Sequence, residues 1–162
     1  MESDLSKGHF NSLPISSITE KVVASPKVNC DNQEIQAVIV DLKKAVEDES
    51  YKAAIPTAEK PSLSDDYIFD KEDEKMILSD LKLDHFVAKV KDLSKGAAKR
   101  KKSGLPQEYL YIFQYPCELI RRDADTSGIE KEKNLIYIKI NVRKVPYQIV
   151  IVVSFHKNNP KV

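Results

Sequence analysis

The sequence has little of what builds a metal centre or a nucleotide site. Its two cysteines, Cys30 and Cys117, are far apart and belong to no CxxC motif or Cys/His cluster. A zinc site is therefore not indicated, one disulfide stays open, and a reducing cytoplasm is the default location. The four glycines form neither GxGxxG nor GxxxxGK[ST], so nucleotide binding has no support. HExxH and GxSxG are absent and the three histidines are scattered, so we expect no metal and no cofactor.

Long apolar runs are also missing. The longest, Ile149 to Val153, has the length of a strand and falls far short of a membrane span. The N-terminal residues MESDLSKGHFNSLPISS show no basic region followed by an apolar stretch, which argues against a Sec signal peptide. We therefore expect a cytoplasmic protein with no membrane partner.

Charge is distributed unevenly along the chain, although the net charge is only +1. Residues 1–80 contain 9 Lys and Arg against 17 Asp and Glu, whereas residues 81–162 contain 17 against 8. This asymmetry predicts a basic C-terminal domain with a polyanionic partner, preceded by an acidic segment. The alternative is that both halves are simply solvated surfaces.

The N-terminal half divides into three segments. Residues 1–30 are rich in Ser, Lys, Asn and Pro without periodicity, which predicts a flexible segment. Residues 31–52 are predicted to form an amphipathic helix capped by Asp31 or Asn32. The apolar residues of that helix lie on one face: Ile35, Val38, Ile39, Leu42 and Val46. Two prolines and small polar residues predict a linker over 53–66.

The C-terminal segment, 67–162, is predicted to begin with a second helix. The acidic run from Asp70 to Glu74 suits a helix N-terminus. Apolar residues then recur at roughly helical spacing: Ile77, Leu81, Phe86, Val87, Val90 and Leu93. We expect this helix to end near Lys95 or to continue to Lys102, or else to divide into two shorter helices at Ser79 and Asp80.

Beyond Pro106 the periodicity changes to that of strands. The run from Tyr109 to Tyr115 predicts a strand that can extend to Ile120, and residues 121–134 predict a loop. LIYIKINV and QIVIVVSF then predict an antiparallel hairpin over 135–155 at the centre of the core. This order of elements predicts an α+β domain, with helices packed on a small antiparallel sheet.

Basic side chains gather at two places in this domain. Five of them lie within KGAAKRKKSG with no acid between them: Lys95, Lys99, Arg100, Lys101 and Lys102. Arg121 and Arg122 follow the first predicted strand. Such cations beside a tyrosine-rich sheet suit RNA, whose phosphates they would contact while bases stack nearby. A solubility or localisation role is the alternative.

Three residues of the predicted hairpin can carry chemistry. His156 follows the most apolar strand at the point where the chain leaves the sheet, and an imidazole there can act as an acid or a base. Tyr137 and Lys139 share one face of the preceding strand, and the ammonium can hold a phosphate. The alternatives are a surface histidine and a half-buried strand tyrosine.

The strand pair LIYIKINV…IVIVVSFH resembles the C-terminal signature of MqsR-type toxins in the RelE-like ribonuclease superfamily. The resemblance covers residues 135–156, with a longer turn here. It implies a RelE-like fold and a metal-independent endoribonuclease toxin in which the 2′-hydroxyl of RNA attacks the adjacent phosphorus. Tyr137 takes the place of the family's strand tyrosine, Lys139 that of its lysine, and His156 that of the basic residue after SF.

The resemblance also shows a departure. The family's lysine on the earlier strand has no counterpart in YLYIFQY, and Gln114, Arg121 or Arg122 would have to substitute for it. RNA is the expected partner, together with a cognate antitoxin or immunity protein. Two alternatives stay open: a non-catalytic interaction protein such as an immunity protein, effector or adaptor, and a nucleic-acid-binding module without cleavage.

Overall fold

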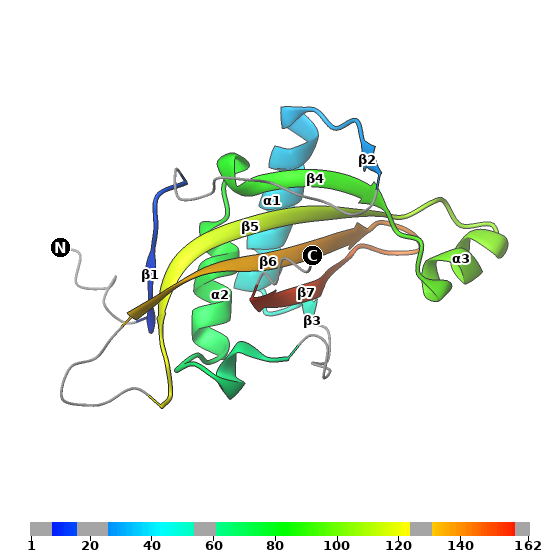
Figure 1. Cartoon of the computed structure of the whole chain (residues 1–162). Coiled ribbons are helices and arrows are strands. Elements are labelled where there is room, and N and C mark those ends of the chain that lie inside the picture. Colours follow the sequence, from blue (N-terminus) through cyan, green and yellow to red (C-terminus); the bar gives the residue numbers. More distant parts are fainter. Residues whose placement is uncertain (1–7, 16–25, 54–60, 124–130, 158–162) are drawn as a thin grey trace.

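The structure, a computed structural model, describes residues 8–15, 26–53, 61–123 and 131–157 (Figure 1). Its helices are α1 (Asn32–Glu47), α2 (Lys71–Asp80) and α3 (Lys95–Lys102), with 3-10 turns η3 (Leu63–Asp65) and η4 (Leu83–His85). The strands are β1 (Phe10–Ser12), β2 (Lys27–Val28), β3 (Lys52–Ala53), β4 (Phe86–Lys91), β5 (Tyr109–Ile120), β6 (Lys131–Arg143) and β7 (Ile149–Lys157). None of the described helices is long and apolar enough to cross a bilayer.

All described strands join one sheet in the order β2-β4-β5-β6-β7-β3, with β1 paired to the second half of β5. Every pairing is antiparallel except that of β3 with β7. The hairpin formed by β6 and β7 lies within the main core, because Ile136, Ile138 and Ile140 are fully buried. The α+β class and the terminal hairpin are therefore confirmed, although the sheet has seven strands.

The two faces of the sheet have different surroundings. On the helical face, α1 and α2 pack across β5, β6 and β7, as Figure 1 shows behind the sheet. The other face, here called the second face, has a smaller apolar cluster centred on Val90, Leu110 and Ile112. Tyr137 and Val153 pack against this cluster. Side chains on the second face can therefore be assigned from the alternation along each strand.

The first helix agrees with its prediction. Asp31 caps α1 by accepting a hydrogen bond from the Glu34 amide, and all five residues of the predicted apolar stripe are buried. They belong to the same core cluster as the hairpin. The N-terminal half therefore contributes directly to the core of the basic half.

The predicted helix continuing past residue 80 is wrong. Asp70 does begin α2, through a capping box with Asp73, but the helix ends at Asp80. Residues 86–91 form β4 instead, with Phe86 packed toward the main core and Val87 and Val90 packed on the second face. Apolar residues from two faces of one strand produced the apparent helical spacing. The predicted alternative, two shorter helices meeting at Ser79 and Asp80, was correct only in placing the end of α2 there.

Of the remaining boundaries, one agrees with its prediction, because β5 does extend through Pro116 to Ile120. Others differ: β6 begins at Lys131, inside the predicted 121–134 loop. Within 1–30, where a flexible segment was expected, β1 and β2 pair with the sheet. Within 53–66, η3 buries Leu63, and residues 54–60 lie outside the described part.

Candidate functional site

Three residues singled out in the sequence lie together on the second face. Tyr137 of β6 is directly opposite His156 of β7, and their ring centroids are 5.4 Å apart. The Nζ atom of Lys139 lies 5.6 Å from the centre of the Tyr137 ring. We call these three side chains the Tyr137 cluster. All three are half-buried, and a pocket of about 230 Å³ opens beside His156 at the β7 edge.

A β-bulge in β7 places His156 on this face. Val150 and Val152 belong to the main core on the helical face, so strict alternation would send residue 156 there too. The register shifts between the pairs Lys139–Ser154 and Ile140–Val152, which adds one residue to β7. As a result Phe155 packs against the main core and His156 turns toward Tyr137.

The protonation states of the cluster follow from its surroundings. Burial raises the pKa of Tyr137, so its phenol keeps its proton at neutral pH. The Nδ1 atom of His156 lies 2.9 Å from the Lys157 carbonyl oxygen. Because a carbonyl only accepts, Nδ1 carries the hydrogen in this bond, and a neutral ring then has its basic lone pair on Nε2. The pair therefore combines a proton donor with a proton acceptor.

Gln114 extends the cluster onto a third strand. It lies opposite Tyr137 on β5, its side chain is 2% exposed, and its Oε1 atom has no hydrogen-bond partner among the described residues. Buried acceptors of this kind are uncommon and call for an explanation. Gln114, Tyr137 and His156 thus form one row across β5, β6 and β7. Of the three conjectured substitutes for the missing lysine, only Gln114 lies in this row.

Arg121 and Arg122 lie elsewhere and already have polar partners. Arg121 pairs with Asp123 and Glu132, and the Arg122 Nε atom donates to the Ser64 carbonyl oxygen. They follow the last residue of β5, whereas α3 precedes the first. Twelve residues of strand, a path of roughly 40 Å along the bent β5, lie between the two sites (Figure 1). The structure therefore does not bring the two groups of predicted RNA-binding residues together.

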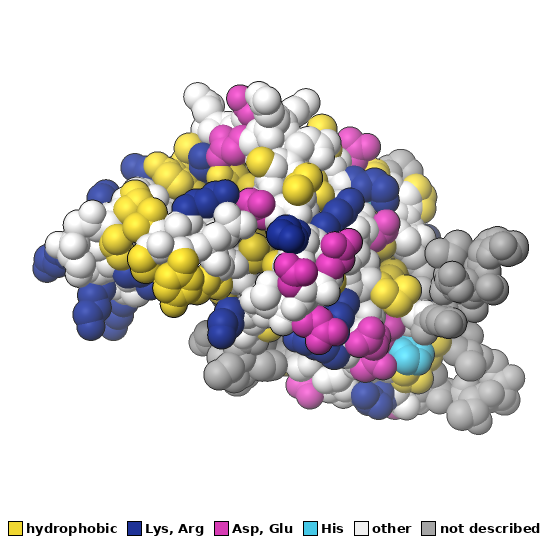
Figure 2. Space-filling model, turned by 180° about the vertical axis from the view of Figure 1, so that it is seen from behind, with side chains coloured by type: hydrophobic (Ala, Val, Ile, Leu, Met, Phe, Trp, Pro, Cys, Tyr) yellow, Lys and Arg dark blue, Asp and Glu magenta, His cyan; other side chains and the backbone are white. Residues whose placement is uncertain are grey.

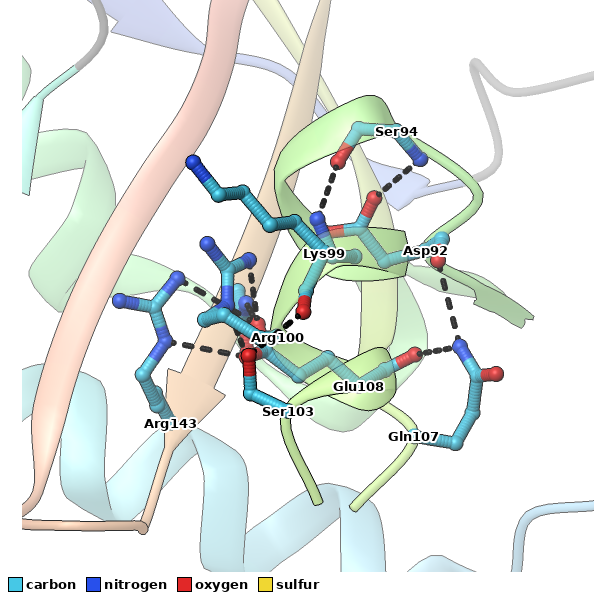
Figure 3. Close-up of polar contacts among 10 residues, drawn as sticks. Asp92, Ser94, Lys99, Arg100, Ser103, Gln107, Glu108 and Arg143 are labelled. Carbon is cyan, nitrogen blue, oxygen red and sulfur yellow. Dashed lines mark hydrogen bonds and ion pairs between the residues drawn. The ribbon is translucent and has the colours of Figure 1, made fainter. Parts of the chain in front are cut away.

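The basic cluster of α3 divides into an anchor and an exposed part (Figure 3). Arg100 donates from Nε and Nη2 to the carboxylate of Glu108. The remaining four members are exposed and have no ion-pair partner in the described part of the chain: Lys95, Lys99, Lys101 and Lys102. Arg100 is therefore the one cation of this cluster that holds the helix to the sheet.

Glu108 is the centre of that anchor. Its side chain is 9% exposed, it accepts from Asn141 Nδ2 at 2.7 Å, and it lies 3.2 Å from Arg143 Nε. Burial alone would raise the pKa of Glu108, but hydrogen bonds from Arg100 and Asn141 and the charge of Arg143 outweigh it, so the pKa is lowered. Asn141 shares its strand face with Tyr137 and Lys139. α3 is therefore attached to the face that carries the Tyr137 cluster.

The sequence did not indicate the carboxylate partners of four buried or half-buried tyrosines. Among the described residues these pairs are Tyr51 with Glu74, Tyr67 with Glu132, Tyr111 with Glu34 and Tyr115 with Asp80. The members of each pair are 23 to 77 residues apart, so no local pattern could reveal them. Two of them, those of Glu34 and Asp80, join α1 and α2 to β5.

One group of side chains could hold a cation. A ring nitrogen of His9 and carboxylate oxygens of Asp70 and Asp73 lie within 4.8 Å of one another. Hydrogen bonds already occupy these oxygens, because Asp73 accepts from the His9 amide, from His9 Nδ1 and from the Asp70 amide. The arrangement is fully explained as the cap of α2.

Comparisons with known proteins give no family for this chain. No protein-family model, no curated protein and no solved structure matches it. The resemblance to MqsR-type toxins consequently depends on residues 135–156 and on the geometry of the side chains they carry.

Proposed function

We propose that this chain is a metal-independent endoribonuclease of the toxin type, with a RelE-like arrangement of helices on one face of its sheet. The observation that carries the proposal is the Tyr137 cluster, in which a phenol, an imidazole and an ammonium gather on one face. The rings of Tyr137 and His156 are 5.4 Å apart. These are the groups that cleavage of RNA by its own 2′-hydroxyl requires.

Each residue has a role that follows from its surroundings. His156 takes the proton of the 2′-hydroxyl at Nε2 as that oxygen bonds to phosphorus. Because Nε2 is buried in the free chain, this role requires the imidazole to turn toward the bound RNA. The bond between phosphorus and the 5′-oxygen breaks, and the leaving oxygen takes the phenolic proton of Tyr137, whose pKa is raised by burial. The ammonium of Lys139 stabilises the charge on the phosphoryl oxygens. The products are a 2′,3′-cyclic phosphate and a 5′-hydroxyl.

The test is cleavage of RNA in EDTA by the full chain. His156→Ala and Tyr137→Phe should each lower the rate by about 10² to 10⁴, the usual contribution of a general acid or base. Lys139→Gln should lower it by roughly 10² to 10³. The matched controls are His9→Gln and Tyr147→Phe, which alter a histidine and a tyrosine outside the cluster and should retain full activity.

The product identifies the reaction. Mass spectrometry should find a 2′,3′-cyclic phosphate, and an oligonucleotide of 2′-deoxy sugars should resist cleavage because it lacks the nucleophile. Intact RNA at high protein concentration, or equal activity of the wild type and His156→Ala, would contradict the proposal. The same assay in Mg²⁺ without EDTA tests metal independence.

A second candidate is an RNA-binding module without cleavage. Gln114, a neutral side chain, stands in the cluster row where the toxin family would have a lysine on the earlier strand. With one fewer cation the cluster would stabilise less charge in the transition state. Such a module would bind RNA with a steep dependence on salt and leave it intact.

A protein partner is part of the proposal. An antitoxin or immunity protein for a cytoplasmic ribonuclease would cover the basic surface and would itself be acidic. Growth arrest on expression of the chain in bacteria, abolished by His156→Ala, would support both the toxin and its cytoplasmic target. Growth arrest that His156→Ala leaves unchanged would favour a non-catalytic interaction protein.

A further inference from the structure

A charged patch and the row of side chains beside it extend the proposed site. The patch consists of the four exposed lysines of α3: Lys95, Lys99, Lys101 and Lys102. Figure 2 shows the side of the molecule that carries α1 and α2, with Lys and Arg beside hydrophobic side chains at the α3 end, on the left, and acidic side chains over the middle and the opposite half. An anionic ligand would therefore be attracted to the α3 end and repelled from the helical side.

The helix dipole does not account for the positions of these lysines. Cations near a helix C-terminus are stabilised by the dipole, and this applies to Lys99, Lys101 and Lys102. Lys95, however, lies in the first turn, where the dipole favours acids, and that turn contains none. Lys95 and Lys99 are also one turn apart and repel each other. The position of Lys95 is thus electrostatically unfavourable, and a bound anion would relieve this repulsion.

The anchor fixes the helix in place before any ligand arrives. An eight-residue helix is too short to be stable by itself. Here Ser94 caps it by accepting from the Ala97 amide, and Arg100 ties it to Glu108 (Figure 3). The four lysines are therefore presented on a fixed support, which lowers the entropy lost when they bind.

A continuous row connects this support to the Tyr137 cluster. On the second face of β6, alternate residues from the anchor to the cluster are Arg143, Asn141, Lys139 and Tyr137. Four residues of strand separate Asn141 from Tyr137, about 13 Å. A pocket of about 220 Å³ opens between the anchor and the β6–β7 turn.

We propose that single-stranded RNA crosses the second face along β6, with α3 gripping phosphates two or more nucleotides from the bond cleaved at the Tyr137 cluster. In this assignment the four lysines bind phosphate, and Arg100 and Arg143 are positioning residues that act through Glu108. The inference depends on the proposed function for the location of the cleaved bond. The grip on a polyanion is independent of cleavage.

The test measures binding of the full chain to a short single-stranded 2′-O-methyl oligonucleotide, which has no nucleophile to be cleaved. Fluorescence anisotropy gives the dissociation constant over a range of KCl concentrations. Replacing the four lysines, as K95Q/K99Q/K101Q/K102Q, should weaken binding roughly a hundredfold at physiological salt. The slope of log affinity against log salt should fall by about 3, which is about 0.7 for each lost phosphate contact.

The matched control removes the same charge from other surfaces, as K43Q/K44Q/K52Q/K71Q, all exposed lysines of α1, β3 and α2. Its affinity and salt slope should stay near those of the wild type. An equal loss of affinity in both quadruple variants would mean that only net charge matters, and would contradict the proposed RNA path. Competition by polyglutamate as effective, per charge, as that by the oligonucleotide would also overturn it, in favour of an acidic protein partner.

The two proposals can fail separately. If the α3 variant loses binding but the wild type leaves unmodified RNA intact, the proposed cleavage is wrong and the proposed phosphate binding by α3 stands. If cleavage needs His156 but the α3 variant binds and cleaves RNA like the wild type, the proposed RNA path is wrong and the proposed ribonuclease activity stands. Circular dichroism of each variant checks that the fold survives.

Discussion

The two ends of β5 carry similar cationic side chains in opposite circumstances. At its start, four lysines of α3 are exposed without ion-pair partners in the described residues, and only Arg100 is used internally. At its end, Arg121 is paired with Asp123 and Glu132, and Arg122 donates to a backbone carbonyl. A count of basic residues treats both ends alike. Their partners show that the α3 end keeps four cations without an ion pair in the described residues, whereas the other end keeps only Arg122.

The acidic residues at the two ends of β5 also differ, in how deeply they are buried. Glu108 is 9% exposed and holds two arginines, whereas Glu132 is 35% exposed and holds Arg121 and Lys157. A buried acid that organises cations is hard to replace, because its loss leaves charges uncompensated in a poorly solvated place. A half-exposed acid can be replaced by water. The anchor at α3 is therefore the more fragile of the two.

The largest expected effect is the loss of the anchor. Glu108→Ala should lower the free energy of unfolding by about 3 kcal/mol, because Arg100 and Arg143 lose their shared partner. Glu132→Ala, the matched change at the other end, should cost about 1 kcal/mol or less. Urea denaturation at neutral pH measures both. Equal shifts of the two urea denaturation midpoints would contradict the difference in stability expected between the two ends of β5.

Lowering the pH should reduce the stabilisation that Glu108 and Glu132 provide, although by less free energy than Glu108→Ala removes. The pKa of Glu108 is lowered below its unfolded value of 4.5, and so is that of Glu132, where burial is outweighed by hydrogen bonds from Tyr67 and the charge of Lys157. Groups with a lowered pKa stabilise the fold above the unfolded pKa, and this stability is lost as pH falls through the folded pKa.

This dependence can be measured as the slope of unfolding free energy against pH below pH 4.5. Glu108→Gln and Glu132→Gln should each flatten that slope, because each removes one titrating group whose pKa differs between the folded and unfolded chain. A slope that neither substitution changes would mean that other carboxylates dominate acid unfolding, with Glu34 the first to test because its pKa is also lowered.

The two ends of β5 should also differ in their contribution to RNA binding, by a smaller effect. Lys99→Gln removes one exposed cation and should weaken binding of the 2′-O-methyl oligonucleotide about fourfold at physiological salt. Arg121→Gln removes one paired cation at the other end and should leave the dissociation constant unchanged. A weakening by Arg121→Gln as large as that by Lys99→Gln would show that internal pairing does not remove a cation from binding.

The smallest expected effect concerns the strand β1, which pairs with the far half of β5. A hydrogen bond from Asp73 raises the pKa of His9 above 6.5, with further attraction from the charges of Asp73 and Asp70, although burial opposes it. A raised pKa stabilises the fold fully below pH 6.5, and this stability is lost as pH rises through the folded value.

The expected loss is below about 1 kcal/mol because the His9 side chain is 43% exposed. His9→Gln should remove this part of the dependence of unfolding free energy on pH while leaving Glu108→Gln and Glu132→Gln effects unaltered. Thermal melting on either side of pH 6.5 is sufficient. A pH dependence that persists in His9→Gln would assign it to other groups.

The sequence correctly predicts the elements whose hydrophobic pattern depends on contact with a single neighbouring layer of the fold. α1 shows a single buried stripe because it contacts the core on one side only, β6 alternates buried isoleucines with Tyr137, Lys139 and Asn141, and β7 begins with an unbroken apolar run. β4 was predicted as helix because apolar residues lie on both of its faces, and only its pairing with β5 specifies a strand. Its Leu93, counted in the predicted stripe, is 73% exposed just beyond the strand.

The site could be predicted only in part for a related reason. Alternation correctly placed Tyr137 and Lys139 together, since two residues of one strand share a face. The division of the α3 cations depends on Glu108, which precedes β5, and on Asn141 and Arg143 of β6, more than 30 residues farther along the chain. No local spacing could distinguish Arg100 from the lysines beside it.

The bulge in β7 lets both halves of that strand keep their partners on β6, although the chain has one residue more than the pairing needs. A substitution at Val153 would change a packing contact and leave the register of the strand intact. Deleting that residue would remove the extra position, and Val152, Ser154, Phe155 and His156 would keep their partners on β6 in a regular strand. Natural variation at this position should therefore be permissive both for exchanges and for a gap of one residue.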